Sequence, residues 1–341
     1  MLASVLIPTF ARSDKLARCL TALAVQNFDS ANFEVIVGFD GPDARAEAGA
    51  RETWKAAGGK ARLELVQCPR QGYTLVRNDI LARATGRLLV SLNDDVRPCP
   101  DFLQVHAQAH GSLKSQGKGD AIIVGASPFC RRDPETLLDR LARATSMVFF
   151  YDAMDRPPHN PDHDWGFRHC FGLNFSADLA MVRDVGGFFA RPHLYGYDDI
   201  ELAFRLTQKF NLPVLYRPQA LAPHEHFYKP ADLIDREHKL GVAAWHFVRA
   251  NPAFGMACFG RDITTPAELG YSREFVSRER AAVDRVRESF LKIATIPGAS
   301  VDGDHQSLLL EMLLHQFLPL KRWTWRTGLL EAADAKMAIA A

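Results

Sequence analysis

The chain has 341 residues, of which 47% are hydrophobic and 24% charged, and its formal net charge is +1. This length suffices for one large α/β domain with an appendage or for two domains, and the composition is that of an ordinary globular protein. A nearly neutral chain gives no support for nucleic-acid binding, which usually leaves a basic footprint.

The cysteines and the N-terminal residues bear on the cellular compartment. Six cysteines are scattered without a CxxC pair, so we expect free thiols and neither a disulfide framework nor a zinc site. The first residues lack the basic and long apolar regions of a signal peptide. No apolar run approaches the roughly 20 residues that span a bilayer. We therefore expect a cytoplasmic protein that could touch a membrane from that side.

Strand and helix signals alternate along the first half of the chain. Short apolar runs that end at turn signals predict buried strands, and the amphipathic stretches between them predict helices. The predicted strands are 3–10, 33–40, 61–68, 87–94 and 120–127. The predicted helices are 13–25, one that runs through Trp54, 72–84 and 100–114. Apolar strands separated by helices indicate a parallel sheet whose strand carboxyl ends meet at one edge, where such sheets bind ligands.

The rest of the chain is less regular before it becomes helical. We predict a helix near 134–148, a long Pro-, His- and Asp-rich loop from 151, and strands at 169–177 and 212–216. A loop of that length is usually functional. From about 231 the pattern is helical to the end. We therefore predict a domain over 1–230 and a helical extension over 231–341 that could contact an acceptor, a second copy or a membrane.

The stretch YGYDDIELAFR at 195–205 joins an acidic start to an apolar helical stripe. Asp198 and Asp199 would lie at the helix start, where the dipole and the free N–H groups keep carboxylates ionised. An ionised, rigidly held carboxylate at a cleft edge can act as a general base. The alternative is an acidic first turn that only caps the helix.

Polar side chains also follow the predicted second, third and fourth strands. LNDDV at 92–96 offers two carboxylates and an amide, which suit a hard divalent cation, although a simple turn is the alternative. Asp40 could accept from a base or a ribose hydroxyl, or merely form a turn with Gly41. Arg77 and Asn78 could reach the same edge or remain on a helix surface.

His224 and His226 form an HxH pair after the last short strand. Alternate residues of a strand share a face, so either imidazole could add a nitrogen ligand to a cation held by Asp95. The alternative is a satisfied surface pair. A dedicated zinc site is disfavoured because no third soft ligand lies at a familiar spacing.

Five segments follow one another along the chain in an order typical of one enzyme family: VLIPTF, FEVIVGFDGPD, GYTLVRNDILARATGRLLVSLNDDV, FGLNFSADLAMVRDVGGF and YGYDDIELAFRL. Together they resemble the family 2 glycosyltransferases with the GT-A fold, over about residues 3–228. The resemblance implies the α/β GT-A fold of nucleotide-diphospho-sugar transferases, a Rossmann-like, mostly parallel sheet, here with an all-α C-terminal appendage. It also implies an inverting, metal-dependent transfer of a sugar from a nucleoside-diphosphate sugar to an acceptor hydroxyl, in cell-surface glycan or polysaccharide synthesis.

Position by position, the resemblance implies roles for single residues. The catalytic base matches Asp199, with Asp198 as the alternative base or an acceptor contact. The metal ligands match Asp95 and His224, with His226 less favoured, and the cation would be Mn²⁺ or Mg²⁺. The residues implied to bind the nucleotide and the donor are Pro8, Thr9, Asp40, Arg77, Asn78, Asn93 and Asp94. The residues implied to contact the acceptor are Asn174, Gly187 and Glu201.

Some positions depart from the family pattern. Asn93 replaces the first aspartate of the DxD motif, and Asp198 replaces the glutamate of the base motif. An amide at position 93 can still hydrogen-bond a ribose, so metal binding need not fail while Asp95 remains. Phe39 replaces the first of two adjacent aspartates after the second strand, which is expected to alter the nucleotide contacts.

The expected partners are a nucleotide sugar, with UDP as the family's commonest nucleotide, and a glycan or lipid-linked acceptor. The basic and Trp-rich segment 306–330 could lie on the inner face of a membrane, or it could be a core-packing or dimer helix. Two other functions stay open. A sugar nucleotidyltransferase would want a Gly-rich basic loop where this chain has PTFARSD, and an inactive scaffold subunit of a glycan-assembly complex would use 231–341 as a docking surface.

Overall fold

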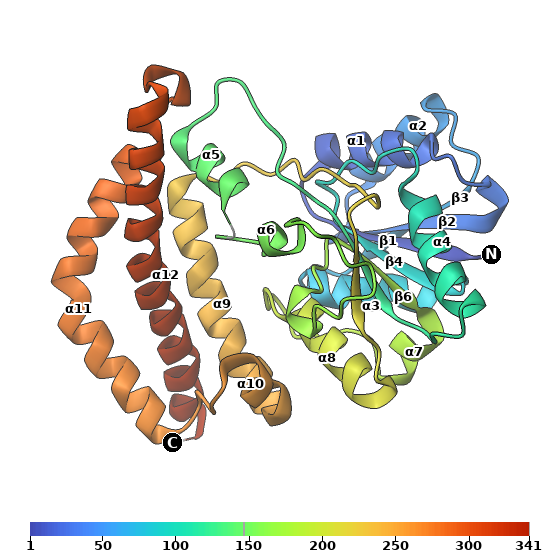
Figure 1. Cartoon of the computed structure of the whole chain (residues 1–341). Coiled ribbons are helices and arrows are strands. Elements are labelled where there is room, and N and C mark those ends of the chain that lie inside the picture. Colours follow the sequence, from blue (N-terminus) through green and yellow to red (C-terminus); the bar gives the residue numbers. More distant parts are fainter. Residues whose placement is uncertain (146, 341) are drawn as a thin grey trace. The chain divides into compact units, whose positions relative to one another are not determined.

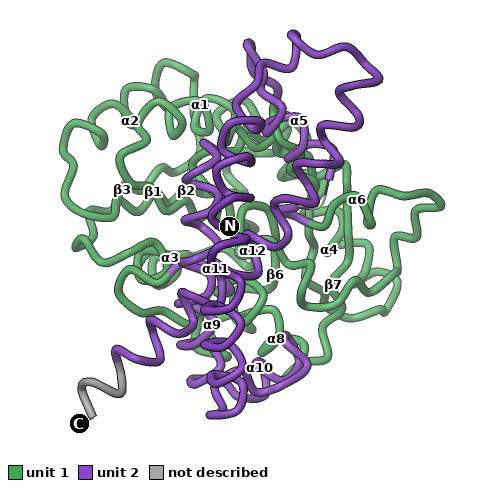
Figure 2. The backbone as a smooth tube through the Cα atoms, turned by 90° about the vertical axis from the view of Figure 1, so that its left-hand side faces the viewer, with its two compact units in different colours: residues 1–130, 150–194, 198–226 green, residues 131–149, 195–197, 227–341 purple. Residues whose placement is uncertain are grey.

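The computed structural model describes residues 1–145 and 147–340 of the chain, which form two compact units (Figure 2). The first unit comprises 1–130, 150–194 and 198–226, and the second comprises 131–149, 195–197 and 227–341. The second unit thus includes two segments that the sequence analysis placed in the first domain.

A seven-stranded sheet forms the centre of the first unit (Figure 1). Its strands, in the order β3-β2-β1-β4-β6-β5-β7, are β1 (Ala3–Thr9), β2 (Phe33–Asp40), β3 (Arg62–Cys68), β4 (Leu88–Leu92), β5 (Ile122–Gly125), β6 (Asn174–Asp178) and β7 (Val214–Arg217). All pairs are parallel except those of β6, which runs antiparallel to β4 and β5. The mostly parallel sheet is confirmed. The antiparallel direction of β6 was not predicted, because an apolar run has the same pattern in a parallel and in an antiparallel strand.

The helices of the first unit follow the predicted alternation. They are α1 (Ser13–Ala24), α2 (Ala44–Ala56), α3 (Tyr73–Arg83), α4 (Phe102–Ser115), α6 (Tyr151–Met154), α7 (Leu179–Asp184) and α8 (Asp198–Phe210), with short 3-10 turns at Ser30–Asn32 and Phe167–His169. On α1 the residues Leu16, Leu20 and Leu23 are buried, as their spacing predicts.

The parallel strands bring polar residues to one edge. Thr9, the last residue of β1, pairs with Phe39 of β2, and Asp40 ends β2 directly beyond it. β4 lies on the other side of β1, with Leu6 opposite Ser91, and the Asn93–Asp95 segment follows it. The carboxyl ends of three neighbouring strands therefore bring Thr9, Asp40 and the Asn93–Asp95 segment to one edge.

The second unit is helical. It contains α5 (Leu137–Ala144), α9 (Pro230–Ala250), α10 (Pro252–Phe259), α11 (Pro266–Ile293), a 3-10 turn at Gly298–Ser300 and α12 (Gly303–Ala340). Glycines let α9 and α12 approach closely. A Cβ at Gly241 would lie 1.9 Å from the carbonyl oxygen of Trp325, and one at Gly328 would lie 2.1 Å from that of His238.

The residues suggested for a membrane surface pack within this unit. The Trp323 indole donates to the Val276 carbonyl at 3.0 Å, and Arg326 donates to the Ser272 hydroxyl at 2.6 Å. Both partners lie on α11, so these contacts favour the alternative of a core-packing helix. Among the helices that the structure describes, none has the length and apolar character needed to cross a bilayer.

The α9–α12 crossing yields a stability prediction. Gly241→Ala should lower the free energy of unfolding by more than about 2 kcal/mol, because a methyl group there overlaps a backbone carbonyl that cannot rotate away. Gly270→Ala is the matched control on α11, since a Cβ there meets nothing within 4 Å. It should raise the free energy of unfolding by about 0.5–1 kcal/mol through helix propensity. Urea unfolding followed by tryptophan fluorescence would measure both, and equal effects would contradict the close crossing.

Candidate active site

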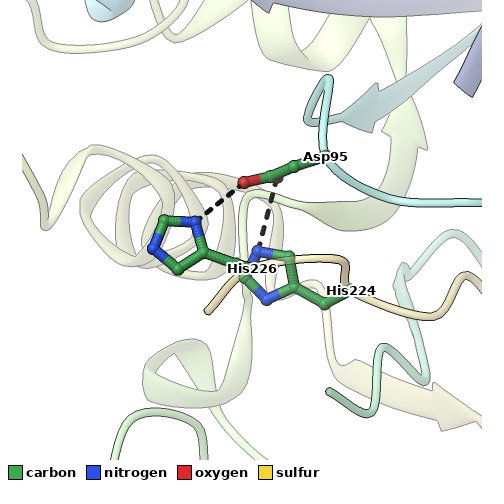
Figure 3. Close-up of side chains that lie close together, drawn as sticks. All are labelled: Asp95, His224 and His226. Atoms are coloured by element: carbon green, nitrogen blue, oxygen red, sulfur yellow. Dashed lines mark hydrogen bonds and ion pairs between the residues drawn. The ribbon is translucent and has the colours of Figure 1, made fainter. Parts of the chain in front are cut away.

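Asp95 lies between two imidazoles at the sheet edge (Figure 3). Its Oδ1 is 3.3 Å from His224 Nε2, and its Oδ2 is 3.1 Å from His226 Nδ1. One ligand atom from each of the three residues lies within 4.8 Å of the other two. Asp95 and His224 are buried, and His226 is half-buried.

Backbone pairing explains how HEH reaches Asp95. The segment around His224 is extended and lies between two others, since His224 N donates to the Pro128 carbonyl at 2.8 Å and Glu225 N donates to the Asp95 carbonyl at 2.6 Å. Alternate side chains of an extended segment share a face. Accordingly His224 and His226 both meet Asp95, whereas Glu225 pairs with Arg18 at 2.8 Å. The geometry brings in both histidines and does not rank His224 above His226.

The residues of this group fit a divalent cation. Asp95 Oδ1 is buried, and among the described residues no hydrogen bond satisfies it. Burial alone would raise the pKa of Asp95, but His224, His226 and Arg12 outweigh that effect and hold the pKa well below its usual range. Burial lowers the pKa of His226, which keeps its ring neutral and its lone pair available. Two imidazoles beside one carboxylate favour a transition metal such as Mn²⁺ over Mg²⁺.

Asp94 completes the acidic pair. Its Oδ2 accepts from the Thr9 hydroxyl at 2.7 Å, and its Oδ1 is 3.3 Å from the Arg12 guanidinium. The same Arg12 nitrogen donates to Asp95 Oδ2 at 2.9 Å. Burial and the neighbouring charge of Asp95 raise the pKa of Asp94 to about 6. The sequence analysis did not identify Arg12, although its place just after β1 puts it at the same edge.

A cavity of about 310 Å³ opens beside this pair. Residues at the ends of β1 and β2 and just after them line it, together with Arg70, and they include Thr9, Phe10, Arg12, Phe39 and Asp40. Asp40 accepts from the backbone N–H groups of Gln71 at 2.7 Å and Gly72 at 2.9 Å, and it forms an ion pair with Arg70. The Arg70 guanidinium lies 3.5 Å above the Phe10 ring centroid. Sequence reasoning missed Arg70, which no motif marks.

Asp198 and Asp199 begin α8, as predicted, but their surroundings differ. Asp198 is buried, with one oxygen bonded to the Tyr73 hydroxyl and the other 2.7 Å from the Arg77 guanidinium. Asp199 is half-buried and accepts from backbone N–H groups, that of Gly172 at 2.7 Å and that of Ile200 at 2.8 Å. Burial and the charge of Asp198 raise the pKa of Asp199 to about 6.

Arg77 connects this acidic pair to the loop after β4. Besides Asp198, it donates to Asn93 Oδ1 at 2.9 Å and to the Gly172 carbonyl at 3.2 Å. Gly172 lies between Arg77 and Asp199, because a Cβ there would lie 2.8 Å from the guanidinium and 3.1 Å from Asp199 Oδ2. Residues from α3, the loop after β4 and the start of α8 thus form one hydrogen-bonded cluster.

Two of the residues predicted to bind the donor lie inside the first unit. Pro8 is buried within β1 opposite Gly38 and does not line the cavity. Asn78 uses both ends of its amide on the backbone of Phe188, which it contacts at 2.8 and 2.9 Å. Pro8 is internal because it lies within a central strand of the sheet, and Asn78 is internal because it supports the turn at Phe188.

The three acceptor predictions also point to internal residues. Asn174 is wholly buried and donates to the carbonyls of Ala126 and Ala220. Glu201 is 2% exposed and pairs with Arg205 one helical turn away. Gly187 is buried, and a Cβ there would lie 2.8 Å from Asn78 Oδ1. These residues hold elements of the first unit together.

Comparison with known proteins agrees with this arrangement. Residues 4–169 match the family described as glycosyl transferase family 2. Validoxylamine A glucosyltransferase of Streptomyces hygroscopicus subsp. jinggangensis (strain 5008) is 28% identical over 278 residues, a match that covers 74% of this chain and 61% of that protein. The chain therefore spans less than two thirds of the length of this curated relative.

Solved structures share the fold. The mannosyltransferase PcManGT of Pyrobaculum calidifontis, in complex with GDP-Man and Mn²⁺, superposes with a TM-score of 0.56 at 18% identity, covering 98% of this chain and 86% of that one. TarS 1–349 of S. aureus, in complex with UDP-GlcNAc, gives a TM-score of 0.51 at 14% identity, covering 96% of this chain and 90% of that one. Over residues 4–169 the chain thus matches glycosyl transferase family 2, and it shares the mostly parallel sheet and the fold of these GT-A structures.

Proposed function

We propose that the protein transfers a sugar from a nucleoside-diphosphate sugar to an acceptor hydroxyl, with inversion and with the help of a divalent cation. The observation that carries this proposal is the cluster around Arg77, which connects the loop of Asn93 to the acidic pair that begins α8. Asp95, with its two histidines, follows in the same loop, and the cavity at Asp40 opens at the same edge.

We assign nucleoside binding and cation binding to two groups of residues. The cavity between Phe10 and Asp40 suits the nucleoside, because it offers an aromatic ring and a carboxylate. Asp95, His224 and His226 would hold a divalent cation, which when bound neutralises the charge of the leaving diphosphate.

Asp199 suits the role of general base better than Asp198. It is half-buried, and its raised pKa makes it a stronger proton acceptor than an ordinary aspartate. Asp198 is buried and already bonded to Arg77 and Tyr73. A base on the acceptor side of the sugar, opposite the diphosphate, gives a single displacement that inverts the anomeric centre.

A screen of candidate compounds can identify the donor and the acceptor. Glucosyl donors, GDP-Man and UDP-GlcNAc enter it because similar proteins carry those names or ligands. We propose that the reaction belongs to cell-surface glycan synthesis, so the acceptors to be tested include lipid-linked glycans. Validoxylamine A is also tested, because the curated relative is named as its glucosyltransferase. A true donor should raise the melting temperature in the presence of Mn²⁺. It should also be hydrolysed slowly without acceptor, whereas an inactive scaffold would show no hydrolysis.

Removing the base should abolish most of the transfer. Asp199→Asn should lower kcat at least about 100-fold, in line with the contribution of positioned base catalysis, while the Kd for the donor stays within about threefold. Asp184→Asn removes an exposed carboxylate that pairs with Lys209 and should leave kcat within about twofold. Steady-state kinetics and calorimetry would measure both variants. Normal turnover by Asp199→Asn would refute the base assignment.

The pH dependence follows from the raised pKa of Asp199. The base must be ionised, and its pKa is raised to about 6, so activity is present above that pH and is lost as the pH falls through it. The kcat/KM should fall about tenfold per pH unit below pH 6 in the wild type. The residual activity of Asp199→Asn should not show this limb. A wild-type profile that stays flat down to pH 5 would contradict the assignment.

Metal binding should depend on all three residues of the Asp95 group. Asp95→Ala, His224→Ala and His226→Ala should each weaken Mn²⁺ binding at least about tenfold, since each removes one ligand. Glu225→Gln, which changes the residue between the histidines, should keep the Mn²⁺ affinity within about threefold, because Glu225 pairs with Arg18 instead. Titration calorimetry with Mn²⁺ would test the set. An unchanged affinity in His226→Ala would leave only the other two as ligands.

A further inference from the structure

Arg12 contacts both carboxylates of the acidic pair after β4. One terminal nitrogen of its guanidinium lies 2.9 Å from Asp95 Oδ2 and 3.3 Å from Asp94 Oδ1. The mechanism above does not use Arg12. A single cation that bridges two adjacent buried carboxylates occupies the kind of position that a divalent metal takes.

We propose that the Arg12 guanidinium substitutes for the divalent cation while the metal is absent, and that it moves to a phosphate oxygen of the donor when the metal binds. The inference rests on the proposed function, because it requires both a metal and a diphosphate at this edge. It makes Arg12 a donor-binding residue and couples metal binding to nucleotide binding.

The two cations compete for the same oxygen. Asp95 Oδ2 faces both the Arg12 guanidinium at 2.9 Å and His226 Nδ1 at 3.1 Å. A metal bound between Asp95 and His226 would lie next to the guanidinium, and like charges at such distances repel strongly where water is largely excluded. Arg12 must therefore leave Asp95 Oδ2 for the metal to bind it.

Arg12 has room to move, and the carboxylates do not. Its side chain is 41% exposed, whereas those of Asp94 and Asp95 are 5% and 2% exposed. Arg12 also lines the cavity that contains Asp40. A guanidinium displaced from the carboxylates thus remains beside the donor, where its planar array of N–H groups matches a phosphate.

The proposal predicts opposite effects on two affinities. Arg12→Gln should bind Mn²⁺ alone about tenfold more tightly than the wild type, because a competing charge is lost. At saturating Mn²⁺ the same variant should bind UDP or GDP, whichever the wild type binds, about tenfold more weakly, because a phosphate contact is lost. Arg12→Lys keeps the charge and should bind Mn²⁺ alone as the wild type does. Lys15→Gln removes a charge from α1, the helix that Arg12 directly precedes, and should change neither affinity by more than about twofold.

Electron paramagnetic resonance of free Mn²⁺ and calorimetry with the nucleotide would measure these affinities without turnover. Equal Mn²⁺ affinities of Arg12→Gln and the wild type would overturn the proposal and leave the proposed function intact. Tighter Mn²⁺ binding with unchanged nucleotide affinity would overturn the move to the phosphate. Absence of Mn²⁺ binding by every variant, even with nucleotide, would overturn the metal dependence and the Arg12 inference together.

Discussion

The ion pair between the buried guanidinium of Arg77 and Asp198 is the interaction on which the rest of the site depends. Two adjacent carboxylates begin α8, and only one of them, Asp198, receives this cation, at 2.7 Å. Asp198 thereby forms a buried ion pair. Burial and the neighbouring charge of Asp198 raise the pKa of Asp199 to about 6, although the N–H groups of Gly172 and Ile200 that bond it act in the opposite direction. The position of one arginine thus gives two chemically identical side chains different surroundings.

Much of this arrangement can be predicted from the sequence because it follows from periodicity and topology. Apolar runs between helices predict a parallel sheet, and a parallel sheet places Asp40 and the Asn93–Asp95 loop at one edge. The period of two in an extended segment brings His224 and His226 to one face, and their meeting with Asp95 agrees with it.

The remaining features depend on side-chain direction, which no local pattern encodes. Asn174 and Glu201 lie in the motifs as expected but point into the protein, because nearby carbonyls and Arg205 satisfy them. Arg12 and Arg70 come from short loops whose sequences carry no periodic signal, and only the fold shows which carboxylates they meet. The direction of β6 depends on its connection and not on its composition.

The net charge of the chain is close to zero, and at the sheet edge acidic side chains are paired with arginines. Three acidic groups at the sheet edge each meet an arginine from another element: Asp40 meets Arg70, the Asp94–Asp95 pair meets Arg12, and Asp198 meets Arg77. The exposure of these arginines separates them into two kinds. Arg77 is 4% exposed and cannot leave without stranding a buried carboxylate, whereas Arg12 and Arg70 are 41% and 48% exposed. In the proposed reaction a diphosphate would bring negative charge that must be balanced, so the two exposed arginines could respond to the donor while the buried one would keep the proposed base in place.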